Sequence, residues 1–191
     1  MAQKNNTFYY QQYYDSAFSQ GYHKNPHYVS GSYLQNEILD FRYAFSSVLD
    51  VGCAKGKSVE LFNRANKSVV GIDVSEVAVR EAVSLSRNVL QCSVVNMPFE
   101  DNSFEMVFCS DVLEHLLAED VDDAILEMAR VSSDYIAVQS QTSQAAFIGP
   151  FPKDDLPHRS IRSIGVWRRS FEKLGYKAEW RRGNMFVMSK P

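Results

Sequence analysis

The stretch VLDVGCAKG, residues 48–56, decides the fold. Residues 47–51 are expected to form a short buried strand, and the glycines that follow indicate a tight turn before a helix over 56–66. A strand, a glycine turn and a helix in this order are typical of the first unit of a doubly wound α/β domain. In such sheets ligands bind beyond the carboxyl ends of the strands, so this turn is the first candidate for a binding site.

Strands and helices alternate through the rest of the chain. Further strands are predicted at 68–74, 89–95, 104–110 and 134–140, with helices over 75–87, 111–131 and 161–174 and a closing hairpin of 176–182 with 184–190. A break of the long helix near Ala118–Asp120 is left open. We therefore predict an α/β fold with a doubly wound, mostly parallel seven-stranded sheet, a C-terminal antiparallel hairpin and helices on both faces.

The first 45 residues have a different texture. Eight of the ten tyrosines lie there, among Gln, Asn and Ser, and only residues 32–45 show helical spacing. We expect residues 1–45 to form a Tyr-rich cap or lid on a domain of residues 46–191, the whole being one structural domain.

Composition narrows the class of protein. A chain of 191 residues with 45% apolar and 23% charged residues suits one soluble globular domain. It contains neither a run of about 18 apolar residues nor an apolar signal segment, so we expect no membrane span. Three cysteines in apolar surroundings indicate buried thiols in a reducing compartment, and a cytoplasmic location is expected.

Charge is distributed unevenly along the chain. Residues 153–191 carry ten Lys and Arg against four Asp and Glu, whereas the remainder is acidic. A basic segment can face phosphate groups. With a pI near 5.8 we favour a solvated helix face over nucleic-acid binding. The oligomeric state is not predicted.

The glycine turn distinguishes between two nucleotide cofactors. A dinucleotide-binding turn needs G-x-G-x-x-G, but the second and third positions here are Ala54 and Lys57. Asp50 lies two residues before Gly52, where it would repel a pyrophosphate and attract a sulfonium and an ammonium group. Asp73 follows the second strand, where a carboxylate can accept both ribose hydroxyls. These residues favour S-adenosyl-L-methionine (SAM) over NAD.

Three ordered motifs resemble class I, Rossmann-like SAM-dependent methyltransferases. VLDVGCAKG is similar to motif I of that class, VVGIDVS resembles motif II, and NMPFEDNSFEMVFCSDVLEHL resembles the signature of the type 11 methyltransferase-domain family. The tail PHRSIRSIGVWRRSFEKLGYKAEW resembles a segment of glycan-associated O-methyltransferases.

The resemblance implies positions for the cofactor. Asp50, Gly52, Ala54, Lys55 and Gly56 would line the methionine end, and Ser110 would close over it. Asp73 would bind the ribose. The adenine would lie beside Val74, Ser75, Ser93 and Val94, where Ser93 replaces the family's usual acidic residue.

The segment after the fourth strand holds the candidate catalytic residues. Asp111, Glu114 and His115 have i, i+3, i+4 spacing and would share one helix face, and His158 lies in the long loop after the fifth strand. The resemblance to small-RNA and quinone-pathway O-methyltransferases implies a Mg²⁺ or Mn²⁺ site made by these four residues. The alternative is that His115 or His158 acts as general base, with Glu114 bracing the site.

Together these features predict a SAM-dependent O-methyltransferase whose acceptor is a small polyhydroxyl compound, most readily a sugar of a glycan. Two alternatives stay open: an RNA 2′-O-methyltransferase, and a SAM-binding partner subunit without turnover.

Overall fold

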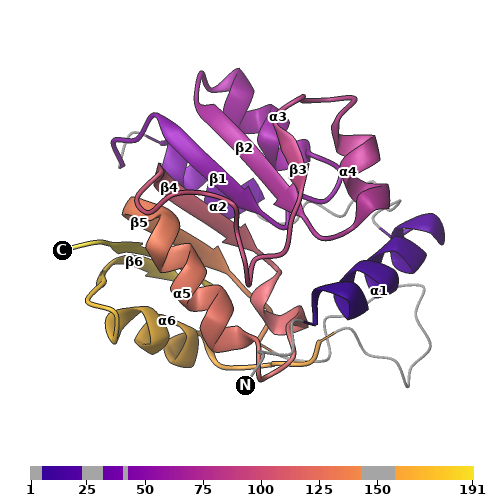
Figure 1. Ribbon diagram of the computed structural model, residues 1–191. Helices are drawn as coiled ribbons and strands as arrows, with labels where there is room; N and C mark the ends of the chain where they lie inside the picture. The colour runs from indigo at the N-terminus through magenta and orange to yellow at the C-terminus, as the bar shows by residue number, and fades with distance from the viewer. Residues whose placement is uncertain (1–5, 23–31, 41–42, 143–157) are drawn as a thin grey trace.

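The predicted seven-stranded sheet is confirmed in the computed structural model, which describes residues 6–22, 32–40, 43–142 and 158–191 (Figure 1). The strand order is β3-β2-β1-β4-β5-β7-β6. β7 is antiparallel to both β5 and β6, so it runs opposite to the other six strands. The strands are β1 (Ser47–Val51), β2 (Ser68–Asp73), β3 (Val89–Gln91), β4 (Phe104–Ser110), β5 (Ser132–Gln139), β6 (Lys177–Arg182) and β7 (Met185–Ser189).

The chain reverses its direction of winding at β1, which lies between β2 and β4. Val51 pairs with Ile72 of β2 on one side and with Cys109 of β4 on the other. The carboxyl ends of these three parallel strands therefore meet at one edge of the sheet, which is the switch point where doubly wound sheets bind ligands.

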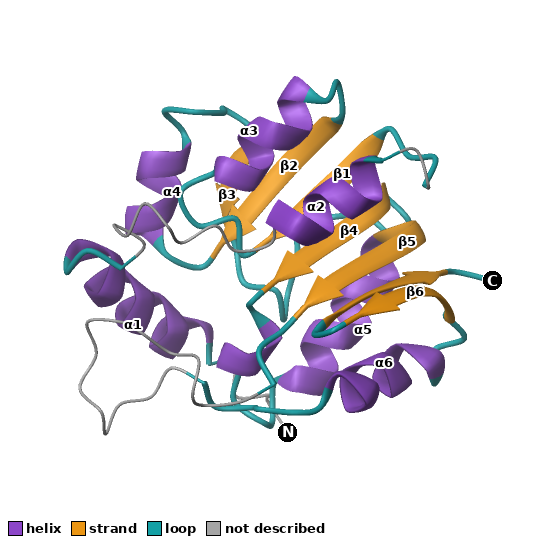
Figure 2. Ribbon diagram, turned by 180° about the vertical axis from the view of Figure 1, so that it is seen from behind, coloured by secondary structure: helices purple, strands orange, loops and turns teal. Residues whose placement is uncertain are grey.

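Helices cover both faces of the sheet, as predicted (Figure 2). One apolar cluster joins the sheet to α5 and α6, and a second joins its other face to α2, α3 and α4. The helices are α1 (Thr7–Ser19), α2 (Ser32–Leu39), α3 (Lys57–Arg64), α4 (Glu76–Ala82), α5 (Val121–Val131) and α6 (Ile164–Glu172).

The break left open near Ala118–Asp120 is present, because α5 begins at Val121. The expected helix over the residues before this break, from 111 on, is not formed. Only a single 3₁₀ turn, Leu113–His115, precedes α5. The chain is interrupted at both ends of this turn, because Asp111 has a left-handed φ of 54° and Leu116 is extended. The buried side chains of Leu113 and Leu116 explain the apolar pattern that imitated a helix.

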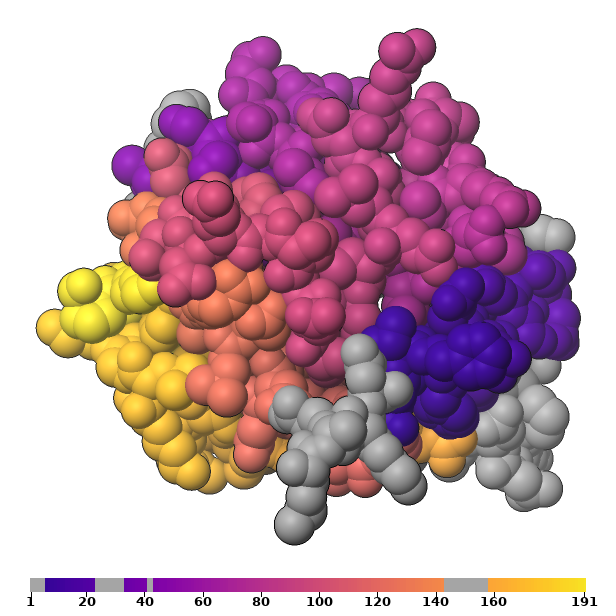
Figure 3. Space-filling view, viewed as in Figure 1, coloured from indigo at the N-terminus to yellow at the C-terminus, as the bar shows by residue number. Residues whose placement is uncertain are grey.

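The N-terminal segment is more regular than predicted. Residues 7–19 form α1, although only residues 32–45 were expected to be helical, and of these 32–39 form α2. In α1 and the turn after it, the aromatic residues Tyr10, Tyr14, Phe18 and Tyr22 recur every four residues and lie on one side. In the space-filling view α1 (indigo) packs directly against the body of the domain (Figure 3).

Smaller differences concern element ends. The third strand stops at Gln91 rather than at residue 95, and the helix expected to end at residue 87 stops at Ala82. Among the described residues no helix is both long and apolar enough to cross a membrane.

Candidate active site

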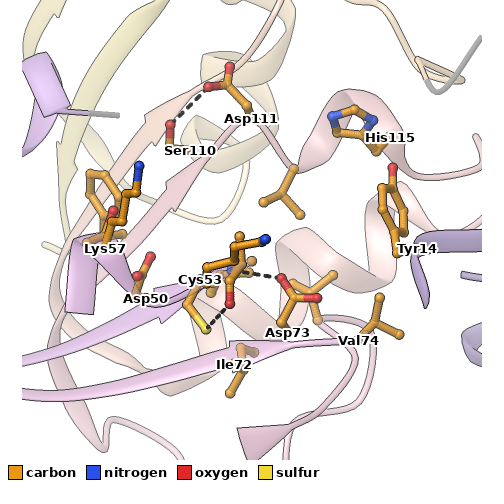
Figure 4. Close-up of a pocket in the computed structure, with 18 of the residues that line it drawn as sticks. Tyr14, Asp50, Cys53, Lys57, Ile72, Asp73, Val74, Ser110, Asp111 and His115 are labelled. Carbon is orange, nitrogen blue, oxygen red and sulfur yellow. Dashed lines mark hydrogen bonds between the residues drawn. The ribbon is translucent and has the colours of Figure 1, made fainter. Parts of the chain in front are cut away.

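A cavity of about 440 Å³ opens at the carboxyl ends of β1, β2 and β4 (Figure 4). Most of the predicted cofactor residues line it: Asp50, Gly52, Ala54, Lys55, Asp73, Val74, Ser93, Val94 and Ser110. Asp111 and His115 also line it, opposite the glycine turn. The sequence motifs therefore converge on one pocket of a size suited to a small ligand.

The glycine turn folds tightly over the end of β2. The backbone N–H groups of Gly52 and Cys53 both donate to the Ile72 carbonyl, at 2.8 and 2.9 Å. Gly52 has a φ of +71°, and a Cβ added there would lie 2.3 Å from Cγ2 of Val112. This position has room for no side chain, which keeps the backbone exposed to the cavity.

Asp73 is held by the backbone around it. Its carboxylate accepts hydrogen bonds from Ala54 N and Ser75 N, both at 2.9 Å, which fixes its orientation at the end of β2. Burial raises the pKa of Asp73 to about 6, and these backbone hydrogen bonds partly offset the shift. Its predicted bond to ribose stays a prediction, and the geometry leaves the carboxylate facing the cavity (Figure 4).

Asp50 is a buried carboxyl group whose charged form has no compensating partner among the described residues. Only 2% of the residue is exposed, and its Oδ2 has no hydrogen-bond partner among the described residues. Burial, with the nearby carboxylate of Asp73, raises the pKa of Asp50 well above its usual range. A cationic ligand group would remove this penalty.

Three predicted cofactor residues have other roles in the structure. Ser75 is fully buried and does not line the cavity, because its hydroxyl caps α4 by accepting from Ala78 N. Gly56 is also buried, and it does not line the cavity. Lys55 lines the cavity, but its ammonium is ion-paired with Glu81 at 2.6 Å.

Two anchors fix α1 over the cavity. Near its start, the Tyr10 hydroxyl donates to the Asp120 carboxylate and accepts from Leu117 N at 2.7 Å. Near its middle, Asp15 accepts from the Ser75 hydroxyl at 2.6 Å and from Val77 N at 3.1 Å. The aromatic side of α1 therefore forms one wall of the pocket, and hydrogen bonds hold it in place.

Glu114, His115 and His158, three of the four candidate catalytic or metal residues, lie close together. One possible ligand atom from each lies within 4.8 Å of the others, and the two imidazole centroids are 4.8 Å apart. Backbone hydrogen bonds connect the segment of Glu114 to the segment that follows His158, since the Glu114 carbonyl accepts from the N–H groups of Arg159 and Ser160. The Glu114 carboxylate accepts from the Ser140 hydroxyl and Gln141 N, at 3.0 and 2.8 Å.

The fourth predicted ligand, Asp111, lies outside this group. Its carboxylate accepts from the side-chain amides of Gln139 and Gln141, at 2.9 and 3.4 Å, and from the Ser110 hydroxyl at 3.2 Å. Asp111 is held in the left-handed region, a strained conformation for a residue with a side chain. Such strain concentrates at functional sites, so Asp111 belongs to the candidate active site even though it does not join the histidines.

Sequence reasoning missed several members of the site. The four-residue repeat of aromatics in the N-terminal segment was visible, but the polar residues between them obscured it. Gln139 lies near the end of the strand predicted at 134–140 and Gln141 directly after it, and neither belongs to a motif. Lys57 was considered only as a mismatch to the dinucleotide pattern. Most of the long loop that precedes His158, including residues 143–157, lies outside the described residues, as do His23 and His27.

Comparisons with known proteins identify a matching domain and proteins of similar fold. A family model described as a methyltransferase domain matches residues 49–134. The magnesium protoporphyrin IX methyltransferase ChlM of Synechocystis PCC 6803, solved with bound SAM, aligns with a TM-score of 0.69 and 15% identity over 100% of both chains. The SAM-dependent methyltransferase of Archaeoglobus fulgidus aligns at 0.66 and 17% identity, over 83% of this chain and 93% of that one. The PH0226 protein of Pyrococcus horikoshii OT3 aligns at 0.67 and 18% identity, over 83% and 88%.

Residues 49–134 thus match a methyltransferase domain, and the chain is similar in fold to SAM-dependent methyltransferases of known structure. At these identities the structural likeness establishes the fold alone, so the acceptor and its activation must be argued from the residues of the site.

Proposed function

We propose that this enzyme transfers the methyl group of SAM to a hydroxyl of a small polyhydroxyl acceptor, a sugar of a glycan. The observation that carries the proposal is a pair of imidazoles: His115 lines the cavity, and the ring of His158 lies 4.8 Å from it. A hydroxyl is a weak nucleophile until a base takes its proton, and a neutral imidazole is suited to that task. Burial lowers the pKa of His158, which favours the neutral form.

In the proposed reaction the acceptor oxygen attacks the methyl carbon in line with the carbon–sulfur bond. The oxygen–carbon bond forms as the sulfur–carbon bond breaks, and the electron pair returns to sulfur, giving S-adenosylhomocysteine. The hydroxyl proton passes to His115, which lines the cavity. Three of the carboxylates that line the pocket, Asp50, Asp73 and Asp111, favour a cofactor with a positively charged sulfonium.

The polar group beside the histidines supports a sugar as acceptor. Asp111, Gln139 and Gln141 combine a carboxylate with two amides, which offer donors and acceptors to vicinal hydroxyls. Because the amides are neutral, they suit an uncharged ring better than a phosphodiester. Residues 1–45 complete the proposal as the cap, with α1 as the wall that excludes water.

The test is to incubate the protein with SAM and separate pools of nucleotide sugars, oligosaccharides and RNA. Release of S-adenosylhomocysteine and the position of the methyl group are followed by mass spectrometry. We expect an O-methylated sugar, and loss of turnover in His115→Ala. Methylated RNA would reject the sugar acceptor, and no product with any pool would favour a non-catalytic SAM-binding subunit.

A further inference from the structure

A second, smaller hollow adjoins the large cavity at His115. Its volume is about 10 Å³, close to that of one water molecule, and its lining is Tyr9, Tyr10, Tyr13, Tyr14, His115 and Arg159. Tyr10, Tyr14 and His115 line the large cavity as well. Because Tyr9 is 39% exposed and Arg159 is also exposed, the outer rim of the hollow lies at the molecular surface. The hollow is too small to enclose a ligand, but a substituent of an acceptor bound at His115 can reach its rim.

Three tyrosine rings of α1 form a row that ends at His115. The ring centroids are 6.2 Å apart from Tyr9 to Tyr13, and 5.1 Å apart from Tyr13 to Tyr14. The last step, from Tyr14 to the imidazole of His115, is 5.8 Å, and the two rings lie beside each other in Figure 4. Aromatic faces of this kind stack on planar groups such as nucleobases. The row therefore connects the exposed rim to the imidazole that we propose as the base.

Arg159 brings a permanent positive charge to the same rim. Its backbone N–H donates to the Glu114 carbonyl at 2.8 Å, which fixes the residue directly after His158. Its Nη2 donates to the Tyr9 hydroxyl at 3.2 Å, so the guanidinium lies at the outer end of the tyrosine row. A guanidinium has five N–H donors in a planar fork that matches the oxygens of a phosphate group. Arg159 thus offers a phosphate contact next to the proposed base.

The two spaces that meet at His115 differ in charge. Aspartates line the large cavity, whereas the described lining of the hollow contains no carboxylate and its fixed charge is that of Arg159. Asp120 is outside this lining and accepts from the Tyr10 hydroxyl. The large cavity therefore suits a sulfonium, and the rim of the hollow suits an anionic group.

We propose that Arg159 and the tyrosine row form an acceptor subsite for a phosphate ester, so that the sugar methylated by this enzyme carries a phosphate. The inference rests on the proposed sugar acceptor and narrows it. The uncharged ring lies at the amides beside Asp111, one hydroxyl reaches His115, and the phosphate meets Arg159. The phosphate ester belongs either to a sugar 1-phosphate or to a nucleoside diphosphate sugar, whose base would stack on Tyr9 and Tyr13.

Calorimetric titration of the full chain saturated with S-adenosylhomocysteine tests the subsite. The probes are the methyl glycoside, the 1-phosphate and the uridine diphosphate derivative of glucose, galactose and N-acetylglucosamine. For at least one of these sugars, the phosphorylated probes should bind at least roughly tenfold more tightly than the methyl glycoside. Tighter binding of the uridine diphosphate sugar than of the 1-phosphate identifies the nucleotide form as the acceptor, and equal binding identifies the simple phosphate.

In Arg159→Gln, the phosphorylated probes should bind on the order of 10–100-fold more weakly, as expected for loss of one charge-assisted contact. The affinity for S-adenosylhomocysteine should persist and show that the fold and the cofactor cavity are intact. Tyr9→Phe removes the same hydrogen bond but keeps the charge, so it should weaken the phosphorylated probes less than Arg159→Gln does. If Arg159 only holds α1 in place through Tyr9, the two variants should instead lose the same affinity, which would contradict the subsite.

Arg169→Gln is the matched control, because it removes an exposed arginine charge of α6 that lines neither space, and we expect all affinities to be unchanged. The inference is overturned if no phosphorylated probe binds, if the methyl glycosides bind as tightly, if Arg159→Gln changes nothing, or if Arg169→Gln causes the same loss. Methylation of a neutral sugar with any of these results would leave the proposed function intact. Methylation of RNA alone would refute the sugar acceptor itself, which is a different failure.

Discussion

Asp73 shows how a single side chain can be fixed by the fold and still be available to a ligand. Two backbone N–H groups orient its carboxylate, and its remaining lone pairs face the cavity. Loss of a carboxylate that accepts two ribose hydrogen bonds costs roughly 2–4 kcal/mol. We therefore expect Asp73→Ala to remove most binding of S-adenosylhomocysteine in calorimetry, and wild-type affinity would contradict the assignment.

The pKa of Asp73, about 6, adds a pH signature. The ionised carboxylate is the form that accepts hydroxyl hydrogen bonds, so affinity should be fully present above pH 6 and fall below it, by up to roughly tenfold per pH unit. 5′-Methylthioadenosine is the suitable ligand because it lacks the methionine ammonium group, for which Asp50 is the predicted partner. Asp73→Asn should bind weakly with a flat profile, and a wild-type profile that is flat between pH 5 and 7 would contradict the role of this carboxyl.

Gly52 and Gly183 separate steric exclusion from backbone strain. Both have positive φ, +71° and +58°, but only at Gly52 would an added Cβ meet another atom, Cγ2 of Val112. Gly183→Ala should cost about 1–2 kcal/mol for the left-handed backbone alone, measured by urea unfolding. Gly52→Ala should cost more and abolish cofactor binding, and Val112→Ala should restore part of the loss. Equal costs for the two glycines would show that the turn is not tightly packed.

The helix α1 depends on contacts that lie far away in the sequence. Tyr10 reaches Asp120 and Asp15 reaches Ser75, so the helix is held by tertiary hydrogen bonds at two points. We expect Tyr10→Phe to lower the protection of α1 amides in hydrogen exchange, and bound S-adenosylhomocysteine to restore it, because the helix lines the cofactor cavity. Exchange unchanged by the ligand would mean that α1 is packing only. Gln20→Ala, outside the anchors, is the control.

The same dependence on distant contacts separates what could be predicted from what could not. The strands were predictable because buried parallel strands appear as continuous apolar runs, and VLDVG marked the switch point directly. The turn at 113–115 was not predictable. Leu113 and Leu116 match a helical repeat in the sequence, but the left-handed conformation of Asp111 prevents a continuous helix. The pairing of Lys55 with Glu81 likewise required knowledge of where α4 packs.

At the scale of the whole molecule, the strand order gathers residues from distant segments onto one edge. His115 follows β4 and His158 follows the loop after β5, yet their rings lie 4.8 Å apart. If the imidazoles act as proposed, EDTA should leave turnover unchanged, and His115→Ala should carry most of the loss. A requirement for added Mg²⁺ or Mn²⁺ would instead show that Glu114, His115 and His158 hold a metal, and each substitution should then cost on the order of 10–100-fold.

The measurement that tests the central claim most directly is a calorimetric titration of the full chain with S-adenosylhomocysteine. The account predicts one site per chain, strong binding in the wild type, and loss in both Asp73→Ala and Gly52→Ala while circular dichroism shows that the fold persists. Absence of binding to the folded wild-type protein, or undiminished binding in both variants, would contradict the assignment of this cavity to SAM.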